Sequence, residues 1–311
     1  MALRNKFLRN IAHYTEYLCL KFLRFLFRIF PAWVAYKSVE VLGWIFFDII
    51  RLRRTTTLNN LRLAFGGIYS EKELIDIARK AYINIGTTFI EILFIEKYKD
   101  RIADIVEIDD EEIVRKSLEL GKGVLMVSAH FGSWEFGGAR FSSLGVDFTT
   151  VAKKQANPYV DKMINDIRGK LGIKIMLKGA QLKHIIKAFK KNELVGLISD
   201  QNSGRNGVFV DFFGRMASTP AGTALLALKY GTPLLVVLAV RTDKVKCRCI
   251  IKNVDVFEND TVETLTQRYT KIIEDIIREY PEQYFWMHNR WKTKPPEPLT
   301  EILENKPEEL W

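Results

Sequence analysis

A histidine and a glutamate five positions apart are the residues of this sequence best suited to chemistry. The apolar run Val124–Val127 predicts a buried strand, and it leads directly into the segment Ser128-Ala-His-Phe-Gly-Ser-Trp-Glu135. Two residues five apart on one helix point roughly 140° away from each other, so they cannot meet there. With His130 on a loop at the strand end and Glu135 in the first turn of a following helix, the chain can fold back and bring the carboxylate to the imidazole.

Such a pair is typical of general base catalysis. His130 would take the proton from an attacking hydroxyl, while Glu135 would fix the tautomer of the imidazole and stabilise the imidazolium. Gly132 permits a tight turn between them, and Ser133 can cap the helix. The same two residues also fit a purely structural role, so a catalytic interpretation needs support from the rest of the chain.

Predicted strands alternate with predicted helices along most of the chain. The strands are expected at 124–127, 148–151, 173–176, 194–199, 233–241 and 246–257. This alternation predicts an α/β fold with a mixed, largely parallel sheet flanked by helices. Ligands bind at the carboxyl ends of the strands in such sheets, and Asp200 follows the strand 194–199. Asp200 is therefore expected on the same edge as His130, either orienting a basic residue or the loop, or acting only as a turn cap.

Residues 1–54 have the pattern of a membrane anchor. They hold ten Lys and Arg against three Asp and Glu, and the run Tyr17–Phe30 is rich in Phe and Leu. Lys21, Arg24 and Arg28 form one polar stripe on a helix, a pattern typical of a segment lying in an anionic membrane interface. The stretch Ile29–Ile50 is interrupted by charges, so we predict an interfacial anchor or shallow hairpin rather than a clean transmembrane helix. The alternative is a pair of ordinary helices packed on a soluble core.

Composition limits the remaining possibilities. The 311 residues carry a net charge of +10, and 48% of them are hydrophobic, which is typical of a globular protein with phosphate-bearing partners. The three cysteines show no zinc-site spacing and no HExxH motif occurs, so we expect no metal site. Four of the nine prolines and five glutamates fall in 295–311. We therefore predict one α/β domain over 55–294, followed by a Pro/Glu-rich tail.

At the segment His130-Phe-Gly-Ser-Trp-Glu135 the chain resembles the lipid A biosynthesis late acyltransferases, a branch of the lysophospholipid acyltransferase superfamily with an H-x4-D/E motif. The resemblance extends over about residues 50–294. Asp211 departs from the pattern, because the family has a proline there. The other blocks that carry the resemblance are Asn59–Leu61, Glu91, Lys153 with Asn157-Pro158, Arg168, Asp200-Gln201, Val208–Phe213, Thr219–Gly222 and Tyr284–Lys292.

The resemblance implies a glycerolipid acyltransferase-like fold and an O-acyltransferase that needs no cofactor. The acyl donor would be acyl-acyl carrier protein, and the acceptor a hydroxyl of a lipid A precursor at the cytoplasmic face of the cell inner membrane. His130 and Glu135 would be catalytic. The residues expected to bind substrate are Lys153, Arg168, Asp200 and Arg290. The partners would be acyl carrier protein, the glycolipid and an anionic membrane surface, and no nucleic acid.

Three alternatives stay open at this stage. The acceptor can be another lipid, such as a phosphoinositide mannoside or a lysophospholipid. The chain can be a basic membrane- or nucleic-acid-binding protein without catalysis, although it has none of the usual nucleic-acid-binding motifs. It can also be a soluble α/β hydrolase, but the G-x-S-x-G motif of that fold is missing.

Overall fold

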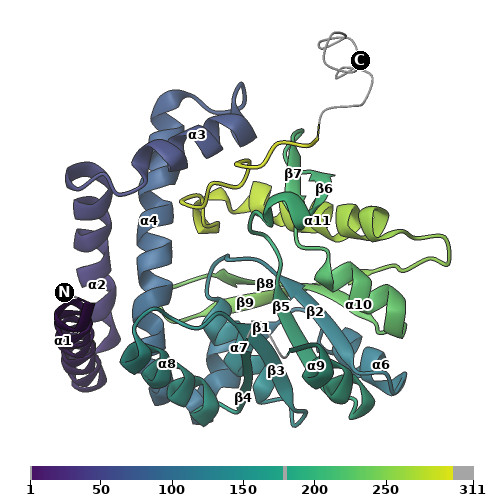
Figure 1. Cartoon of the computed structure of the whole chain (residues 1–311), viewed down its shortest axis with the longest axis horizontal. Coiled ribbons are helices and arrows are strands. Elements are labelled where there is room, and N and C mark those ends of the chain that lie inside the picture. The colour runs from purple at the N-terminus through teal and green to yellow at the C-terminus, as the bar shows by residue number, and fades with distance from the viewer. Residues whose placement is uncertain (1, 178–180, 297–311) are drawn as a thin grey trace.

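A seven-stranded sheet forms the centre of the molecule (Figure 1). The computed structural model describes residues 2–177 and 181–296. The strand order is β1-β9-β8-β2-β5-β3-β4, and every neighbouring pair is parallel except β8 and β9. The strands are β1 (Val106–Ile108), β2 (Val124–Ser128), β3 (Phe148–Ala152), β4 (Ile173–Leu177), β5 (Leu194–Ile198), β8 (Leu234–Arg241) and β9 (Cys247–Val254). The predicted α/β fold with a largely parallel sheet is confirmed.

Helices cover both faces of this sheet and create two buried clusters. Successive residues of β2 alternate between them, because side chains of a strand point to opposite faces: Leu125 and Val127 belong to one cluster, Val124 and Met126 to the other. The first cluster lies under α3 (Arg54–Phe65), α9 (Gln181–Lys190), α10 (Gly222–Tyr230) and α11 (Val262–Glu279). The second lies under α5 (Ile102–Ile105), α6 (Glu111–Glu119), α7 (Trp134–Ser142) and α8 (Pro158–Lys170).

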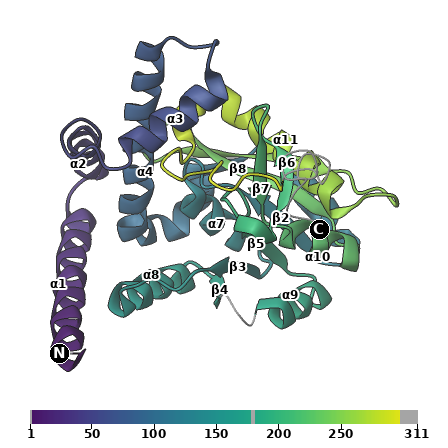
Figure 2. The same cartoon turned by 45° about the horizontal axis from the view of Figure 1, so that its top comes forward.

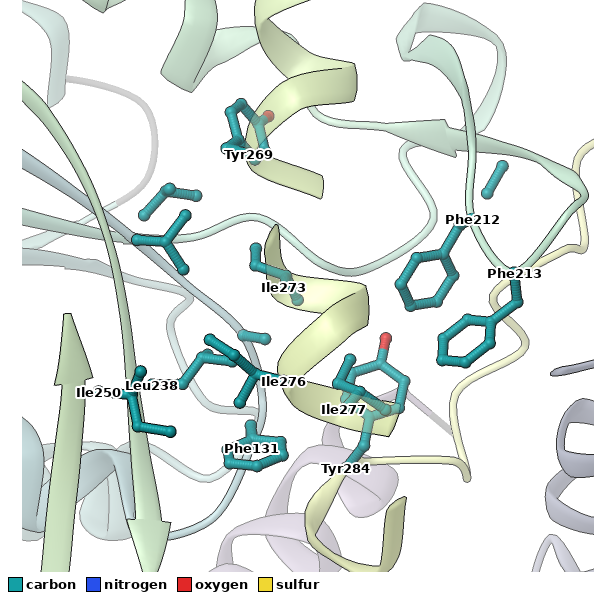
Figure 3. Close-up of a cluster of buried hydrophobic side chains, with 14 of the residues drawn as sticks. Phe131, Phe212, Phe213, Leu238, Ile250, Tyr269, Ile273, Ile276, Ile277 and Tyr284 are labelled. Atoms are coloured by element: carbon teal, nitrogen blue, oxygen red, sulfur yellow. The ribbon is translucent and has the colours of Figure 1, made fainter. Parts of the chain in front are cut away.

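The first cluster reaches the loop that follows β2. In Figure 3, α11 lays Ile273 and Ile276 over Leu238 of β8 and Ile250 of β9. Phe131, the residue after His130, is fully buried in the same cluster. Burying a phenylalanine contributes roughly 1.5–3 kcal/mol, so the loop that carries His130 is held by the core on one side.

The N-terminal helices lie beside the sheet rather than on it. α1 (Ala2–Ile29) projects along one side of the molecule, and α2 (Ala32–Trp44) runs alongside α4 (Glu71–Phe94) in both views (Figures 1 and 2). A π-helical turn, Ile45–Ile49, follows α2. A capping box of Ser70 and Glu73 starts α4. α4 contributes to both buried clusters, which joins the N-terminal helices to the core.

The charged stripe predicted on α1 turns partly inward. Arg24 pairs with Glu96 in the 3-10 segment Ile95–Arg101, and Arg28 lies 3.9 Å from the same carboxylate. The apolar face is then left outside: Phe22 is 60% exposed and Phe25 is 59% exposed. Among the described residues, no helix combines the length and the hydrophobicity needed to cross a bilayer.

Several smaller predictions need correction. The strand expected over 246–257 is shorter, and β1 was missed because three residues carry too little periodicity to be recognised. A separate hairpin of β6 (Val208–Asp211) and β7 (Met216–Thr219) was also missed. The proline that starts α8 and its Asn157 cap are as predicted. Apart from its first two residues, the tail predicted for 295–311 lies outside the described residues.

Candidate active site

The site forms where β2 and β5 end. These strands are parallel neighbours, with Ser128 opposite Ile198, so the loops that follow them emerge side by side. His130 lies in the first loop and Asp200 in the second. Gly132 has a φ of +53°, and a Cβ there would lie 2.0 Å from the carbonyl oxygen of Ala239. Only glycine fits that turn, which brings the chain back toward the sheet.

Asp200 is the carboxylate that orients His130. The imidazole Nδ1 lies 2.8 Å from Asp200 Oδ1, and the backbone N–H of His130 donates to Oδ2 at 3.1 Å. Asp200 is only 6% exposed. A carboxylate on Nδ1 favours the tautomer with the proton on that nitrogen, and Nε2 is then left to accept a proton. Asp200 therefore lies on the predicted edge and contacts a basic residue, His130, while its predicted contact with substrate stays a prediction.

The same contact sets the proton affinity of both groups. Burial lowers the pKa of His130, but the Asp200 carboxylate outweighs burial, and the pKa of His130 is raised above its ordinary value, with a smaller contribution from Glu135. Burial raises the pKa of Asp200, yet the His130 imidazole lowers it by more, so the pKa of this carboxyl lies below its usual range. The pair is therefore built to keep Asp200 ionised and to stabilise the imidazolium.

The predicted hydrogen-bonded contact between the Glu135 carboxylate and the His130 imidazole is wrong. Glu135 accepts two hydrogen bonds from Arg168, from Nε at 3.1 Å and from Nη2 at 2.5 Å. The reason is the point at which α7 begins: Trp134 starts the helix, which turns Glu135 toward α8 while His130 faces the loop after β5. The sequence did contain the signal for the true partner, since Asp200 follows a strand predicted to share the edge of His130.

Arg290 was predicted to bind substrate, and the structure contradicts this. Its side chain is 2% exposed and donates to the carbonyl oxygen of Ser218 and the hydroxyl of Thr219. Its guanidinium also lies over the ring of Phe212, 5.2 Å from the centroid. Burial lowers the pKa of Arg290. Arg290 therefore anchors the C-terminal segment to β7 behind the site. Trp286 and Trp291 pack in the same region, as predicted.

An open cleft of about 700 Å³ brings the remaining predicted residues together. His130, Glu135, Lys153 and Arg168 all line it. Hydrophobic residues of α4 form its other wall, namely Ile85, Phe89 and Ile92. The cleft therefore combines an imidazole, cationic groups and an apolar wall.

A narrower, mainly apolar cavity of about 120 Å³ continues from this cleft between α7 and the sheet. Both spaces share the lining residues Trp134, Glu135, Val151, Ala152, Arg168 and Ile198. Gly137, Gly138 and Gly196 line its inner part, with Phe148 beside them. A Cβ on Gly196 would lie 2.8 Å from the ring of Phe148, so this glycine allows the ring to pack closely against β5.

Three glycines near the β6–β7 hairpin lie away from the site. Gly204, Gly207 and Gly214 line neither the cleft nor the narrow cavity. They belong to the segment of the β6–β7 hairpin, which packs against α11 through the hydrogen bond from the backbone N–H of Phe213 to Glu274. Within residues 2–177 and 181–296, no group of three His, Cys, Asp or Glu side chains is arranged to hold a metal ion.

Comparison with known proteins agrees with this geometry. Residues 3–293 match the sequence profile of the bacterial lipid A biosynthesis acyltransferases. The chain belongs to this family. The predicted resemblance is therefore confirmed, and the match also includes the N-terminal helices, which the sequence resemblance had left out.

Individual relatives span most of the chain. It is 31% identical over 271 residues to the lipid A biosynthesis lauroyltransferase of Escherichia coli, covering 85% of this chain and 87% of that protein. It is 28% identical over 251 residues to the palmitoleoyltransferase of the same organism, covering 79% and 81%. A phosphatidylinositol mannoside acyltransferase of Mycolicibacterium smegmatis is 24% identical over 195 residues, covering 61% and 64%.

Proposed function

We propose that this protein moves a fatty acyl chain from acyl-acyl carrier protein onto a hydroxyl of a lipid A precursor, with His130 as the general base. The observation that carries the proposal is the position of His130, oriented by Asp200, in a cleft that continues into a narrow apolar cavity. Membership of the lipid A acyltransferase family supports the reaction class.

The chemical steps follow from the two ring nitrogens. Nε2 of His130 takes the proton of the acceptor hydroxyl as its oxygen attacks the thioester carbonyl carbon. Asp200 stabilises the imidazolium through Nδ1. When the tetrahedral intermediate collapses, the carbon–sulfur bond breaks and the proton passes from Nε2 to the leaving thiolate. An ester and a free thiol result, and the enzyme returns to its starting state.

Glu135 and Arg168 serve the charged parts of the substrates in this proposal. Glu135 occupies Nε and Nη2 of Arg168, which holds the guanidinium facing the cleft. Nη1 makes no hydrogen bond within the described part of the chain and can donate to a thioester or phosphate oxygen. Lys153, exposed on the opposite rim, would meet a phosphate of the acceptor.

The narrow cavity fits the acyl chain. It is lined by Phe141, Phe148 and Ile173 as well as by the three glycines. An alkyl chain inside it would therefore be removed from water. Each methylene buried there contributes about 0.8 kcal/mol. The carboxyl end of such a chain would lie near Glu135 and Arg168, where the cavity joins the cleft.

The N-terminal helices would hold the enzyme at the cytoplasmic face of the inner membrane. Their outward residues are apolar and aromatic, including Phe22, Phe25, Trp33 and Trp44. α1 packs both Phe27 and Arg24 against the rest of the molecule, yet it leaves Phe22 and Phe25 exposed. An interfacial anchor explains this exposed apolar surface, and it leaves the cleft beside α4 within reach of lipids.

The test is acyl transfer by detergent-solubilised protein. Labelled acyl-acyl carrier protein and a tetra-acylated lipid A precursor are supplied to the wild type, to His130→Ala and to a matched control, Ser143→Ala, whose exposed hydroxyl contacts only α7. Transfer by the wild type and the control, but not by His130→Ala, supports the proposal. Transfer only to phosphoinositide mannosides or lysophospholipids changes the acceptor. No transfer to any of these lipids contradicts the enzymatic proposal and favours a binding protein.

A further inference from the structure

A buried carboxylate on α4 joins three other parts of the molecule. Glu91 is 1% exposed. Its Oε2 accepts a hydrogen bond from the hydroxyl of Ser133 at 3.0 Å, and its Oε1 accepts one from the hydroxyl of Tyr36 at 3.2 Å. Arg241, the last residue of β8, donates to both oxygens, from Nη2 at 2.8 Å and from Nε at 3.3 Å. Glu91 therefore links the loop after β2, the helix α2 and the sheet.

The same network fixes the backbone of the loop between His130 and Glu135. The hydroxyl of Thr88 donates to the carbonyl oxygen of Gly132 at 2.7 Å and accepts from Arg241 at 3.1 Å. The N–H of Gly132 donates to the carbonyl oxygen of Gln283 at 2.9 Å. The side chain of Gln283 in turn pairs with the backbone N–H and carbonyl of Arg241. Both polar groups of the Gly132 backbone are thus held by residues that Glu91 and Arg241 organise.

Stability alone does not explain such a pair. Removing two charges from water costs several kcal/mol per ion, and well-packed apolar residues of similar volume often serve stability as well or better. The ion pair instead fixes the orientation of the side chains around it, because Arg241 and Ser133 must donate to the Glu91 carboxylate at well-defined angles. The residues held this way lie between the two side chains that face the cleft, His130 and Glu135.

The contact with Tyr36 extends the network to the N-terminal helices. Burial and the nearby Glu91 carboxylate raise the pKa of Tyr36 well above its ordinary value, so its hydroxyl stays protonated and donates. α2 and α4 also approach closely. A Cβ on Gly43 would lie 2.7 Å from the side chain of Ile83, and one on Gly86 would lie 2.9 Å from Val39. The two helices therefore meet through glycines, and the position of Tyr36 is set by that contact.

We propose that Glu91 positions the catalytic loop through Ser133 and Arg241, and that through Tyr36 it makes the position of the loop depend on the docking of α2 against α4. Glu91 touches no substrate and acts through the loop. This inference rests on the proposed function, because it assigns the loop its role through His130. In this proposal the N-terminal helices influence the position of the catalytic loop in addition to anchoring the protein.

The experiment compares Ser133→Ala, Tyr36→Phe and the double variant in the full chain in detergent. Two quantities are measured: the kcat and KM of acyl transfer, and the titration of the His130 imidazole by NMR of histidine-labelled protein. Ser133→Ala should lower kcat about tenfold with little change in KM, the scale of one lost buried hydrogen bond. Tyr36→Phe should lower kcat about threefold, because its hydrogen bond acts on the loop only through Glu91.

The NMR titration separates positioning from mere stabilisation. The charged groups that face His130 are Asp200 after β5, Glu135 on α7 and His288 of the C-terminal segment. A displaced loop weakens the bond to Asp200, so the pKa of His130 should fall in Ser133→Ala. The kcat of the double variant should fall by less than the product of the two single decreases, because both hydroxyls act through the Glu91 carboxylate.

Tyr82→Phe is the matched control. Tyr82 also lies on α4 and donates to the N-terminal segment, at the carbonyl oxygen of Leu52, but it does not contact Glu91. It should lower thermal stability without moving kcat or the His130 titration. Equal changes in kcat and in the His130 titration for Tyr82→Phe and Ser133→Ala would overturn the role of Glu91. A fall in kcat of the double variant equal to the product of the two single falls would overturn the coupling to α2. An active His130→Ala would contradict the proposed function instead, while the titrations would still report the position of the loop in the other variants.

Discussion

Two acid–base pairs face the same cleft, His130 with Asp200 and Glu135 with Arg168. In the first pair the base is an imidazole, which can accept and return a proton. In the second pair the guanidinium stays charged throughout the accessible pH range. The two carboxylates therefore have different roles: Asp200 contacts an imidazole that can exchange a proton, whereas Glu135 contacts a guanidinium that keeps its proton.

The local environments reinforce this difference. Burial lowers the pKa of Arg168, but Glu135 outweighs burial and raises it, so the Arg168 charge is secure. The His130 pKa is raised by Asp200, but the imidazole still titrates. The first pair therefore suits proton transfer and the second suits the binding of an anionic or polarised oxygen.

His130→Ala should lower kcat by about 10⁴, the upper range for loss of a positioned general base. The melting temperature should fall moderately, because the buried Asp200 carboxylate loses the imidazole but keeps the backbone N–H of residue 130. Steady-state transfer assays and thermal unfolding measure the two effects. A large drop in melting temperature with near-normal activity in the folded fraction would remove His130 from the mechanism.

Asp200→Asn should lower kcat by about 10³, because the amide cannot stabilise the imidazolium. The pH profile adds a signed test. The base must be neutral, so wild-type kcat should rise as the pH increases through the raised pKa of His130. Without the carboxylate that pKa falls, and the rise should move to lower pH. An unchanged profile in Asp200→Asn would show that Asp200 does not set the proton affinity of His130.

Glu135→Ala should lower kcat/KM by about 10², mainly by releasing Arg168 from its position at the cleft. Arg168→Ala should give a similar loss, and the double variant should lose little more than either single one. The rise of kcat with pH should move to lower pH by less than it does in Asp200→Asn, because Glu135 contributes less than Asp200 to the raised pKa of His130. A shift in Glu135→Ala as large as that in Asp200→Asn would return Glu135 to the role first predicted for it.

Arg290→Ala should affect turnover least and stability most. Its loss leaves the carbonyl of Ser218 and the hydroxyl of Thr219 without their buried donor, at a cost of about 3 kcal/mol in the free energy of unfolding. Denaturant unfolding measures this, and kcat per folded molecule should fall less than tenfold. A stable Arg290→Ala protein with a raised KM would restore the prediction that Arg290 binds substrate.

The alternation of strands and helices, the family, and the positions of His130 on the loop after β2 and Glu135 in the first turn of α7 could be predicted from the sequence. Apolar runs such as Val124–Val127 are buried on both faces of a parallel sheet, so local composition reveals them. It also placed Asp200 on the correct edge, because parallel neighbours end together. These features depend on residues close in the chain or on the general rules of α/β sheets.

Which groups meet in the site depends on how distant segments pack. Glu135 is five residues from His130 but bonds Arg168, 33 residues away, while Asp200 reaches His130 across 70 residues. Likewise, Arg290 turned out to be a core residue and Glu91 the centre of a buried network. The direction of a side chain depends on where a helix begins and what packs beside it. Those depend on contacts between distant segments, which spacing along the chain does not encode.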